Sequence, residues 1–289
     1  MCRVAPTQAT SRICLVAVAL VAASAASAAG RPLPKHYYLA LGDSLAYGVQ
    51  PDKVARGLPP SAYNTGFVDL FAARLRARNP KLEVVNYACP GESTVTFVLG
   101  VCPWLAEGKK LHRPFGSAQA QGEAALAFLA LHPGQVSPIT VTLFGNDIVP
   151  AFDNCRNLLA CAHSKGPKVI ASFAARLGSI LGRLRASAPG AEIIVTGAWN
   201  FDEEHPNLTT PLFRPLNEAM AREASRVKAR FANPLPLFNI KRSVAIQRAR
   251  LCAYTYICSK ADPHPTDAGY RAYARAVIAA SSYTRSGSP

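Results

Sequence analysis

The feature that most constrains the fold of this chain is a regular alternation of short apolar runs with amphipathic helical patterns. The apolar runs show no strict alternation with polar residues, as in strands that are buried on both faces. They cover Tyr37–Leu41, Leu82–Asn86, Ile139–Phe144, Glu192–Thr196 and Leu235–Ile240. The helical patterns cover Phe67–Arg78, Ala118–Leu131, Lys168–Ser187, Leu216–Phe231 and Asp267–Ala279. This order predicts an α/β protein with a parallel sheet of about five strands, helices on both faces, and reactive loops at the carboxyl ends of the strands.

The start of the chain has the pattern of an export signal. Two arginines precede an apolar run over Ile13–Ala23, and the small-x-small sequence Ala26-Ser27-Ala28 follows it. The run is shorter than the roughly 20 residues that a membrane-spanning helix needs. We therefore expect a signal peptide over residues 1–29, a single domain over residues 30–289, and a secreted mature protein.

The cysteines agree with export. Six of the eight remain after removal of the signal, and an even count in an exported chain suggests three disulfides. They fall into three close pairs, so local pairing is favoured among the possible connectivities: Cys89 with Cys102, Cys155 with Cys161, and Cys252 with Cys258. No C-x-x-C sequence occurs, and no histidine stands at ligand spacing from a cysteine pair, so no metal site is expected.

The chain is basic, with 32 Lys and Arg against 17 Asp and Glu. Loss of the two signal arginines leaves 30 basic against 17 acidic side chains, a charge of +13. Such a charge favours association with an anionic lipid or an acidic cell-wall surface. The basic residues are scattered, with no cluster of five or more and no interleaved aromatic residues, so a nucleic-acid partner is not expected. The expected form is a monomer.

A candidate nucleophile follows the first apolar run. That run leads directly into Gly42-Asp43-Ser44-Leu45, which puts Ser44 at the carboxyl end of the first strand, where open α/β sheets bind ligands. A serine hydroxyl is a weak nucleophile until a neighbouring base accepts its proton. The site therefore requires a well-positioned histidine elsewhere in the chain.

Among the six histidines, His264 has the most suitable context. It lies between two prolines in Asp262-Pro263-His264-Pro265, directly before a predicted helix for which Thr266 or Asp267 is the expected N-cap. A rigid loop at a helix start holds an imidazole in one orientation. His264 is therefore the candidate general base.

Two segments after predicted strands offer donors for an oxyanion, which acyl transfer requires. Gly91, in Cys89-Pro90-Gly91-Glu92, presents a backbone N–H with no side chain in the way. Asn146, in Phe144-Gly145-Asn146-Asp147, offers a side-chain amide. The backbone N–H of Ser44 would complete the set.

The order of Ser44, Gly91, Asn146 and His264 resembles the four sequence blocks of the SGNH hydrolases, also called GDSL esterases and lipases. The Gly-Asp-Ser-Leu sequence at residues 42–45 matches the first block outright, and the blocks extend over residues 37–273. The resemblance implies a flavodoxin-like three-layer α/β/α fold. It also implies a Ser–His(–Asp) mechanism on carboxylic esters, with an oxyanion hole formed by Ser44, Gly91 and Asn146.

Two positions depart from the family pattern. Phe144 stands where the third block usually has its first glycine, although Asn146 keeps its place. Ala261 stands where the family usually has an aspartate three residues before the histidine. Asp262 could reach the ring through a tighter turn, a backbone carbonyl could orient the ring and leave a dyad, or Asp267 could supply the charge. Asp262 is the preferred third member.

The expected function is therefore secreted ester hydrolysis on a small-molecule or lipid ester, without a cofactor or catalytic metal. The long connections and the aromatic residues Trp104, Trp199, Phe201 and Phe213 favour lipid or short-to-medium acyl esters. A carbohydrate O-deacetylase would use the same catalytic residues, and a non-catalytic binding protein on the same scaffold is a further alternative. No phosphate-cradling glycine loop and no G-x-S-x-G sequence occurs, which disfavours a cofactor binder and an α/β-hydrolase.

Overall fold

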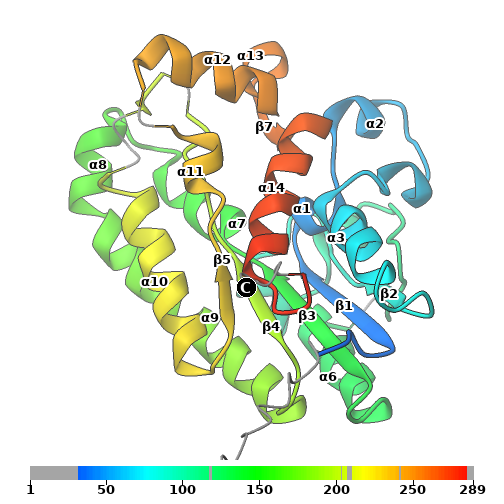
Figure 1. Ribbon diagram of the computed structural model, residues 1–289. Coiled ribbons are helices and arrows are strands. Elements are labelled where there is room, and N and C mark those ends of the chain that lie inside the picture. The colour runs from blue at the N-terminus through cyan, green and yellow to red at the C-terminus, as the bar shows by residue number, and fades with distance from the viewer. Residues whose placement is uncertain (1–31, 117–118, 203, 207–209, 241, 285–289) are drawn as a thin grey trace, which may run out of the picture. The chain divides into compact units, whose positions relative to one another are not determined.

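Five parallel strands form the central sheet of the computed structural model, in the order β2-β1-β3-β4-β5 (Figure 1). The structure describes residues 32–284 except 117–118, 203, 207–209 and 241. The strands are β1 (Tyr37–Gly42), β2 (Glu83–Asn86), β3 (Val136–Thr142), β4 (Ile193–Thr196) and β5 (Arg230–Ala232). The predicted parallel sheet and the flavodoxin-like strand order are confirmed. Because the order reverses between β1 and β3, a ligand crevice is expected at the carboxyl ends of these two strands.

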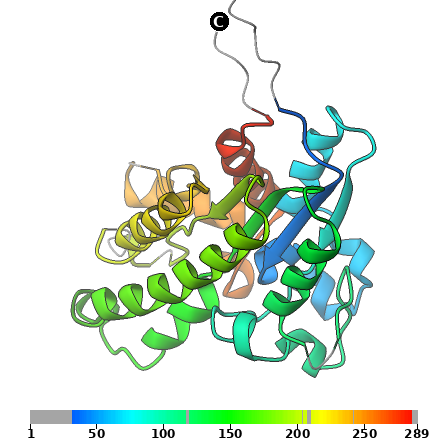
Figure 2. The same cartoon turned by 90° about the horizontal axis from the view of Figure 1, so that it is seen from below.

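Helices cover both faces of the sheet (Figure 2). The pair α3 (Phe67–Arg76) and α14 (Asp267–Ala280) packs on one face. On the other face, α6 (Gln121–Leu131), α9 (Gly166–Ser187) and α10 (Phe213–Arg226) pack on one another. Each predicted helix is present at these positions, with ends shifted by a few residues.

Burial explains why the apolar runs become strands. Every residue of β3 is buried, and Leu39 and Leu41 of β1 are fully inaccessible to solvent. On α3, Phe67, Phe71 and Leu75 recur every four residues, so they face the sheet together and are fully buried. Burying an apolar side chain of this size contributes about 1.5–3 kcal/mol to folding.

Short helices and one small sheet fill the connections between the main elements. The antiparallel pair β6 (Thr255–Tyr256) and β7 (Asp262–Pro265) precedes α14. The short 3-10 helices are η1 (Pro60–Tyr63) and η2 (Val149–Phe152). The remaining helices are α1 (Ser44–Tyr47), α2 (Pro51–Ala55), α4 (Thr96–Leu99), α5 (Pro103–Ala106), α7 (Gly145–Ile148), α8 (Leu158–Ser164), α11 (Leu235–Phe238), α12 (Val244–Tyr254) and α13 (Ile257–Lys260).

The prediction of the fifth strand at residues 235–240 is wrong, because β5 lies at residues 230–232 and residues 235–238 form α11. Pro234 and Pro236 lack the amide N–H that a strand interior donates, but proline suits the first turn of a helix. The helix predicted to end at Phe231 ends at Arg226 instead. Lys228, with a φ of 54°, then turns the chain into a strand too short to show a periodic pattern.

The predicted signal peptide lies outside the described residues and stays a prediction. The described residues, which lie between 32 and 284, belong to one compact unit. Among the residues that the structure describes, no helix combines the length and the hydropathy needed to cross a bilayer.

Candidate active site

The turn after β1 holds Ser44 at the crevice. Gly42 has a φ of 134°, and a Cβ atom there would lie 2.2 Å from the carbonyl oxygen of Thr142, so only glycine fits. Asp43 caps α1 by accepting a hydrogen bond from the Leu45 N–H at 2.9 Å. Ser44 is thus the first residue of α1, half-buried at the carboxyl end of β1.

His264 and Asp262 form a hydrogen-bonded pair on β7. The distance between His264 Nδ1 and Asp262 Oδ1 is 2.7 Å, and the same oxygen accepts the His264 backbone N–H at 2.8 Å. Ala261 precedes the pair with a φ of 50°, which produces the tight turn that lets Asp262 reach the ring. Burial on its own would raise the pKa of Asp262, but the hydrogen bonds and charge of His264 and the charge of Lys260 outweigh it and lower that pKa.

Hydrogen bonds tie the His264 segment to the segment that follows Ser44. The amide Nε2 of Gln50 donates to Asp267 Oδ1 at 2.8 Å. The Tyr270 hydroxyl donates to the Val49 carbonyl oxygen at 2.9 Å. The structure therefore brings together two segments that lie more than 200 residues apart in the sequence. Of the two expected N-caps for α14, the side chain of Thr266 is the one that caps the helix.

The other two expected oxyanion donors are exposed residues in the segments that follow β2 and β3. Gly91 is exposed and has a φ of 88°, and a Cβ atom there would lie 3.0 Å from Pro103 Cβ. The exposed side chain of Asn146 uses Nδ2 to donate one hydrogen bond, to the Glu92 carbonyl oxygen at 2.9 Å. An amide nitrogen carries two protons, so the second one is available to a ligand.

Gln121 links the nucleophile turn to the Gly91 segment, a role that the sequence analysis missed. Its Oε1 accepts from the Gly42 N–H at 2.7 Å, and its Nε2 donates to the Gly42 carbonyl oxygen at 2.9 Å. The same Nε2 donates to Glu92 Oε2 at 2.9 Å. A single buried glutamine at a helix start carries no sequence signal for such a contact.

Arg176 on α9 holds the Gly91 and Asn146 segments together, and sequence reasoning missed it as well. Asp147 Oδ2 accepts the Thr94 backbone N–H at 2.8 Å, while its Oδ1 accepts the Thr94 hydroxyl at 2.5 Å. The Arg176 guanidinium donates to Asp147 Oδ1 at 3.1 Å and to Thr94 Oγ1 at 2.7 Å. We call Arg176, Asp147 and Thr94 the Arg176 clamp. It braces the two segments that carry the oxyanion donors.

Two buried carboxyl groups lie beneath these turns. Burial raises the pKa of Asp43 to about 7, and the nearby charges of Asp147 and Glu92 add to the effect. Burial also raises the pKa of Glu92 to about 7. Glu92 Oε1 is buried without a hydrogen-bond partner among the described residues. Below about pH 7 both groups are therefore mainly protonated.

Each of three disulfides braces one connection of the site. The structure joins Cys89 to Cys102, Cys155 to Cys161 and Cys252 to Cys258, the same local pairs that their spacing favours. The first precedes Gly91, and the third precedes Asp262. The second adjoins an apolar cavity.

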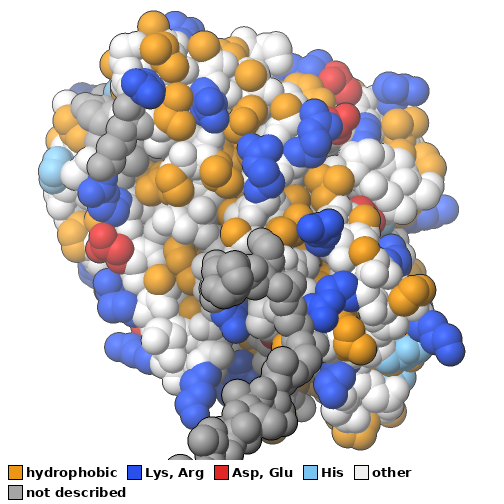
Figure 3. All heavy atoms as spheres, in the orientation of Figure 1, with side chains coloured by type: hydrophobic (Ala, Val, Ile, Leu, Met, Phe, Trp, Pro, Cys, Tyr) orange, Lys and Arg blue, Asp and Glu red, His pale blue; other side chains and the backbone are white. Residues whose placement is uncertain are grey.

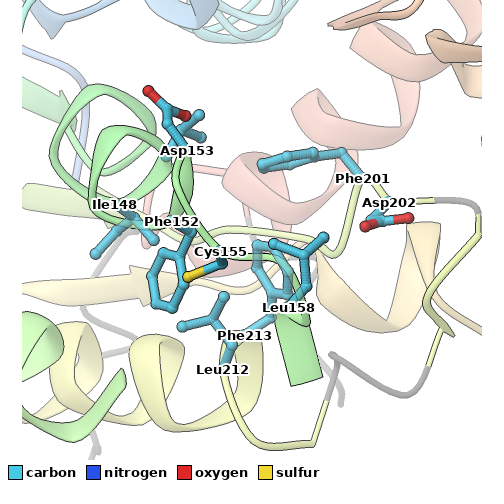
Figure 4. Close-up of a pocket in the computed structure, with 10 residues that line it drawn as sticks. Ile148, Phe152, Asp153, Cys155, Leu158, Phe201, Asp202, Leu212 and Phe213 are labelled. Atoms are coloured by element: carbon cyan, nitrogen blue, oxygen red, sulfur yellow. The ribbon is translucent and has the colours of Figure 1, made fainter. Parts of the chain in front are cut away.

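That cavity is formed by the segments that follow β3 and β4, and its lining begins two residues after Asn146, at Ile148. It has a volume of about 380 Å³, and Figure 4 shows side chains entering it from the segments that follow these two strands. It is lined by Ile148, Val149, Phe152, Asp153, Cys155, Leu158, Phe201, Asp202, Leu212 and Phe213. Of the four aromatic residues considered from the sequence, Phe201 and Phe213 line it. Trp199 stacks on Phe238 in the core, and Trp104 lines a different cavity.

A family model describes most of this chain. The model of the GDSL-like lipase/acylhydrolase family matches residues 40–272, which include Ser44, Gly91, Asn146 and His264. The chain belongs to this family. Its members are carboxylic ester hydrolases, and we assign this GDSL-like hydrolase to the same enzyme class. Among curated proteins, none matches the chain in sequence.

Solved structures of similar fold include three hydrolases. A phospholipase A1 from Streptomyces albidoflavus has a TM-score of 0.59 at 18% identity, covering 86% of this chain and 100% of its own. An extracellular lipase from Streptomyces rimosus has a TM-score of 0.58 at 17% identity, covering 85% and 99%. An acetylxylan esterase from Geobacillus stearothermophilus has a TM-score of 0.52 at 16% identity, covering 86% and 94%. At these identities the likeness establishes the fold.

Within the described residues, no group of three or more His, Cys, Asp or Glu side chains is arranged to hold a metal ion.

Proposed function

We propose that this GDSL-like hydrolase is a secreted serine esterase that cleaves carboxylic esters with an apolar acyl chain. The observation that carries the proposal is the 2.7 Å hydrogen bond between His264 Nδ1 and Asp262 Oδ1, on a segment tied to the one that bears Ser44. With Nδ1 engaged by the carboxylate, Nε2 is the ring nitrogen left to accept a proton from Ser44.

The reaction proceeds in two displacements. His264 Nε2 accepts the Ser44 hydroxyl proton as Ser44 Oγ forms a bond to the ester carbonyl carbon. The tetrahedral intermediate then collapses, the C–O bond to the alcohol breaks, and His264 returns the proton to the leaving oxygen. A water molecule, deprotonated by His264, attacks the acyl carbon; the bond from that carbon to Ser44 Oγ breaks, His264 returns the proton to Oγ, and the acid leaves.

The charge on the intermediate needs donors already in position. The proposed donors are the N–H groups of Ser44 and Gly91 and the second amide proton of Asn146. Removal of one such donor costs about 10²–10³ in kcat in serine hydrolases. The Arg176 clamp and the Gln121 link support this arrangement, because they hold the donor segments without occupying the donors themselves.

The apolar cavity beside Asn146 supports an acyl chain longer than acetate as the preferred substrate. A volume of about 380 Å³ is far more than an acetyl group fills. Among the described residues that line the cavity, most are aliphatic or aromatic, two are aspartates (Asp153 and Asp202), and none is a lysine or arginine. Burying each methylene there contributes about 0.8 kcal/mol, so kcat/KM should rise about fourfold per carbon until the cavity is filled.

A carbohydrate O-deacetylase is the second candidate. One structure of similar fold is an acetylxylan esterase, and the catalytic groups would be the same. Its product is acetate, which would leave the cavity empty. The preference between acetyl and longer acyl esters therefore separates the two candidates.

Secretion is part of the proposal. The sequence of residues 1–29 predicts a signal peptide, and three disulfides support an oxidising compartment for the mature protein. An N-terminal sequence of the exported protein that begins near residue 30 would agree, whereas retention of the first residues would contradict it.

The test is hydrolysis of p-nitrophenyl esters from acetate to dodecanoate by the oxidised protein and by Ser44→Ala. We expect turnover by the wild type, a rise of kcat/KM with chain length, and loss of turnover in the variant. Leu158→Trp should fill the cavity and remove the preference for long chains while acetate turnover is kept. Leu159→Trp, next to it on the same helix but not lining the cavity, is the matched control.

Three results would count against this function. Undiminished turnover by Ser44→Ala would exclude Ser44 as the nucleophile. A preference for acetate that Leu158→Trp does not change would favour the deacetylase. No turnover of any ester by a folded wild type would favour the non-catalytic binding protein.

A further inference from the structure

The first turn of α12 exposes an unusual set of apolar side chains. Val244 and Ile246 are 59% and 52% exposed, and Ala245 between them is exposed too. The next residues of the helix that face inward are Gln247 and Leu251, at 9% and 0% exposure. Three consecutive residues span more than half of a helix circumference, so this turn projects from the body of the protein.

Basic side chains surround this turn. Arg242 and Arg248 are exposed, and neither guanidinium forms an ion pair among the described residues. The connection between β5 and β7, residues 233–261, contains five Lys or Arg and no Asp or Glu. Figure 3 shows hydrophobic and basic side chains side by side over α12 at the top of the view. We call residues 242–248 the docking turn.

The docking turn is linked through a few residues to one wall of the apolar cavity. Asn239, a few residues before it, exchanges two hydrogen bonds of 2.8 Å with the backbone of Asn200. Phe201, which follows Asn200 in the sequence, lines the cavity. After the docking turn, the Cys252–Cys258 disulfide and β7 lead directly to His264. The docking turn is therefore on the side of the sheet where the strands end and the site opens (Figure 1).

We propose that the docking turn binds an anionic lipid surface and brings the cavity to it. Two apolar side chains enter the boundary between headgroups and acyl chains, while Arg242 and Arg248 contact lipid phosphates at the level of the headgroups. The positive charge of the connection matches a negative membrane surface. The inference rests on the proposed esterase function only for the reason why the protein would bind a membrane. The binding itself is measured independently of turnover.

Two other occupants would use only part of this surface. An acidic polysaccharide would bind the arginines but would gain nothing from two exposed β-branched side chains. A second copy of the chain would bury the apolar pair but would bring the same basic residues together. Only an anionic membrane surface matches both features at once.

The test is co-sedimentation of the mature protein with vesicles of phosphatidylglycerol and phosphatidylcholine, compared with phosphatidylcholine alone. We expect binding to the anionic vesicles that weakens with salt. Val244→Asp combined with Ile246→Asp should reduce binding at least about tenfold, and Arg242→Gln combined with Arg248→Gln should remove the preference for the anionic lipid. Leu131→Asp is the matched control, since Leu131 is 75% exposed at the end of α6, a few residues before β3 begins and therefore at the amino ends of the strands.

A cooperative thermal unfolding transition like that of the wild type checks that each variant is folded. The inference is overturned if the wild type does not bind anionic vesicles, or if Leu131→Asp loses as much binding as the double aspartate variant. It is also overturned if the aspartate substitutions change the mass of the free protein in solution, which would mean that the surface joins two copies. Because Ser44→Ala should bind vesicles like the wild type, failure of the esterase proposal would leave this test intact.

Discussion

Two His–Asp pairs lie on connections near the site, and their local hydrogen bonds are nearly the same. His264 Nδ1 is 2.7 Å from Asp262 Oδ1, and His205 Nδ1 is 2.9 Å from Asp202 Oδ2. Their surroundings differ. The His264 side chain is 23% exposed on a paired strand that is hydrogen-bonded into the segment after Ser44, whereas the His205 side chain is 43% exposed.

The second pair belongs to a local turn. Asp202 Oδ1 accepts the backbone N–H groups of Glu204 and His205, and Asn200 Nδ2 donates to the His205 carbonyl oxygen. These contacts stabilise the connection that lines the cavity, and none of the His205 contacts within the described residues is to a nucleophilic side chain. A His–Asp hydrogen bond is thus not enough to define a catalytic base, and the position of the pair relative to the strand ends decides its role.

The largest expected effect separates the two histidines. His264→Ala should lower kcat for p-nitrophenyl butyrate by about 10⁴ or more, because it removes the proposed base. His205→Ala should leave kcat within about twofold, since an exposed pair contributes little. Steady-state kinetics of both variants measures the difference. Equal losses would mean that the two pairs are not distinguished by position.

The second test compares the two aspartates. Asp262→Asn keeps an acceptor for the His264 ring but removes the charge that stabilises the imidazolium, and losses reach about 10⁴ in related triads. Asp202→Asn should change kcat by about twofold or less. If Asp262→Asn retains near-wild-type kcat, the site works as a Ser–His dyad, and the 2.7 Å bond only orients the ring.

The third test weakens the Arg176 clamp, which supports the segments that carry the proposed oxyanion donors. The contacts described for the His205 pair include no such clamp. Arg176→Gln should lower kcat about tenfold with little change in KM, less than the loss of a donor itself. Arg183→Gln is the control, because Arg183 lies on the same helix, is similarly exposed and pairs with Glu123 outside the site. An equal effect of both changes on kcat would show that the clamp has no specific part in catalysis.

The smallest effect is on stability. Because the pKa of Glu92 is raised to about 7 from an ordinary value of 4.5, the folded state holds its proton more tightly than the unfolded chain. The free energy of unfolding should therefore fall as the pH rises from about 4.5 to 7, by at most about 1.4 kcal/mol per pH unit for this group.

Glu92→Gln removes the titratable carboxyl group and keeps an oxygen that accepts from Gln121. It should therefore flatten the fall of the free energy of unfolding with pH. Urea unfolding at several pH values measures it. Parallel curves for the wild type and Glu92→Gln would show that Glu92 is ionised in the folded protein throughout this range.

The sequence was sufficient for the parts of the molecule that depend on local pattern. Burial on both faces made four of the five strands and all five main helices recognisable, and the four motif blocks located Ser44, Gly91, Asn146 and His264. Their catalytic roles stay predictions. The fifth strand was misplaced because three paired residues carry no periodicity, while a proline-rich apolar run imitated a strand.

Contacts between distant segments could not be predicted in the same way. Gln121 reaches Gly42, and Arg176 reaches Thr94, only because the strand order places their helices beside those turns. Asp262 reaches the His264 ring because Ala261 adopts a left-handed conformation. An alanine in the sequence does not indicate that conformation. Such contacts depend on the packing of the whole chain, so the sequence of a single segment does not indicate them.

The central claim is that Ser44 is activated by His264. The most direct measurement is labelling with a fluorophosphonate, followed by peptide mass spectrometry of the modified site. The account predicts one adduct, on Ser44, which forms on the wild type and His205→Ala but is lost or strongly slowed in His264→Ala. Labelling at another residue, or labelling of Ser44 that His264→Ala leaves unchanged, would contradict it.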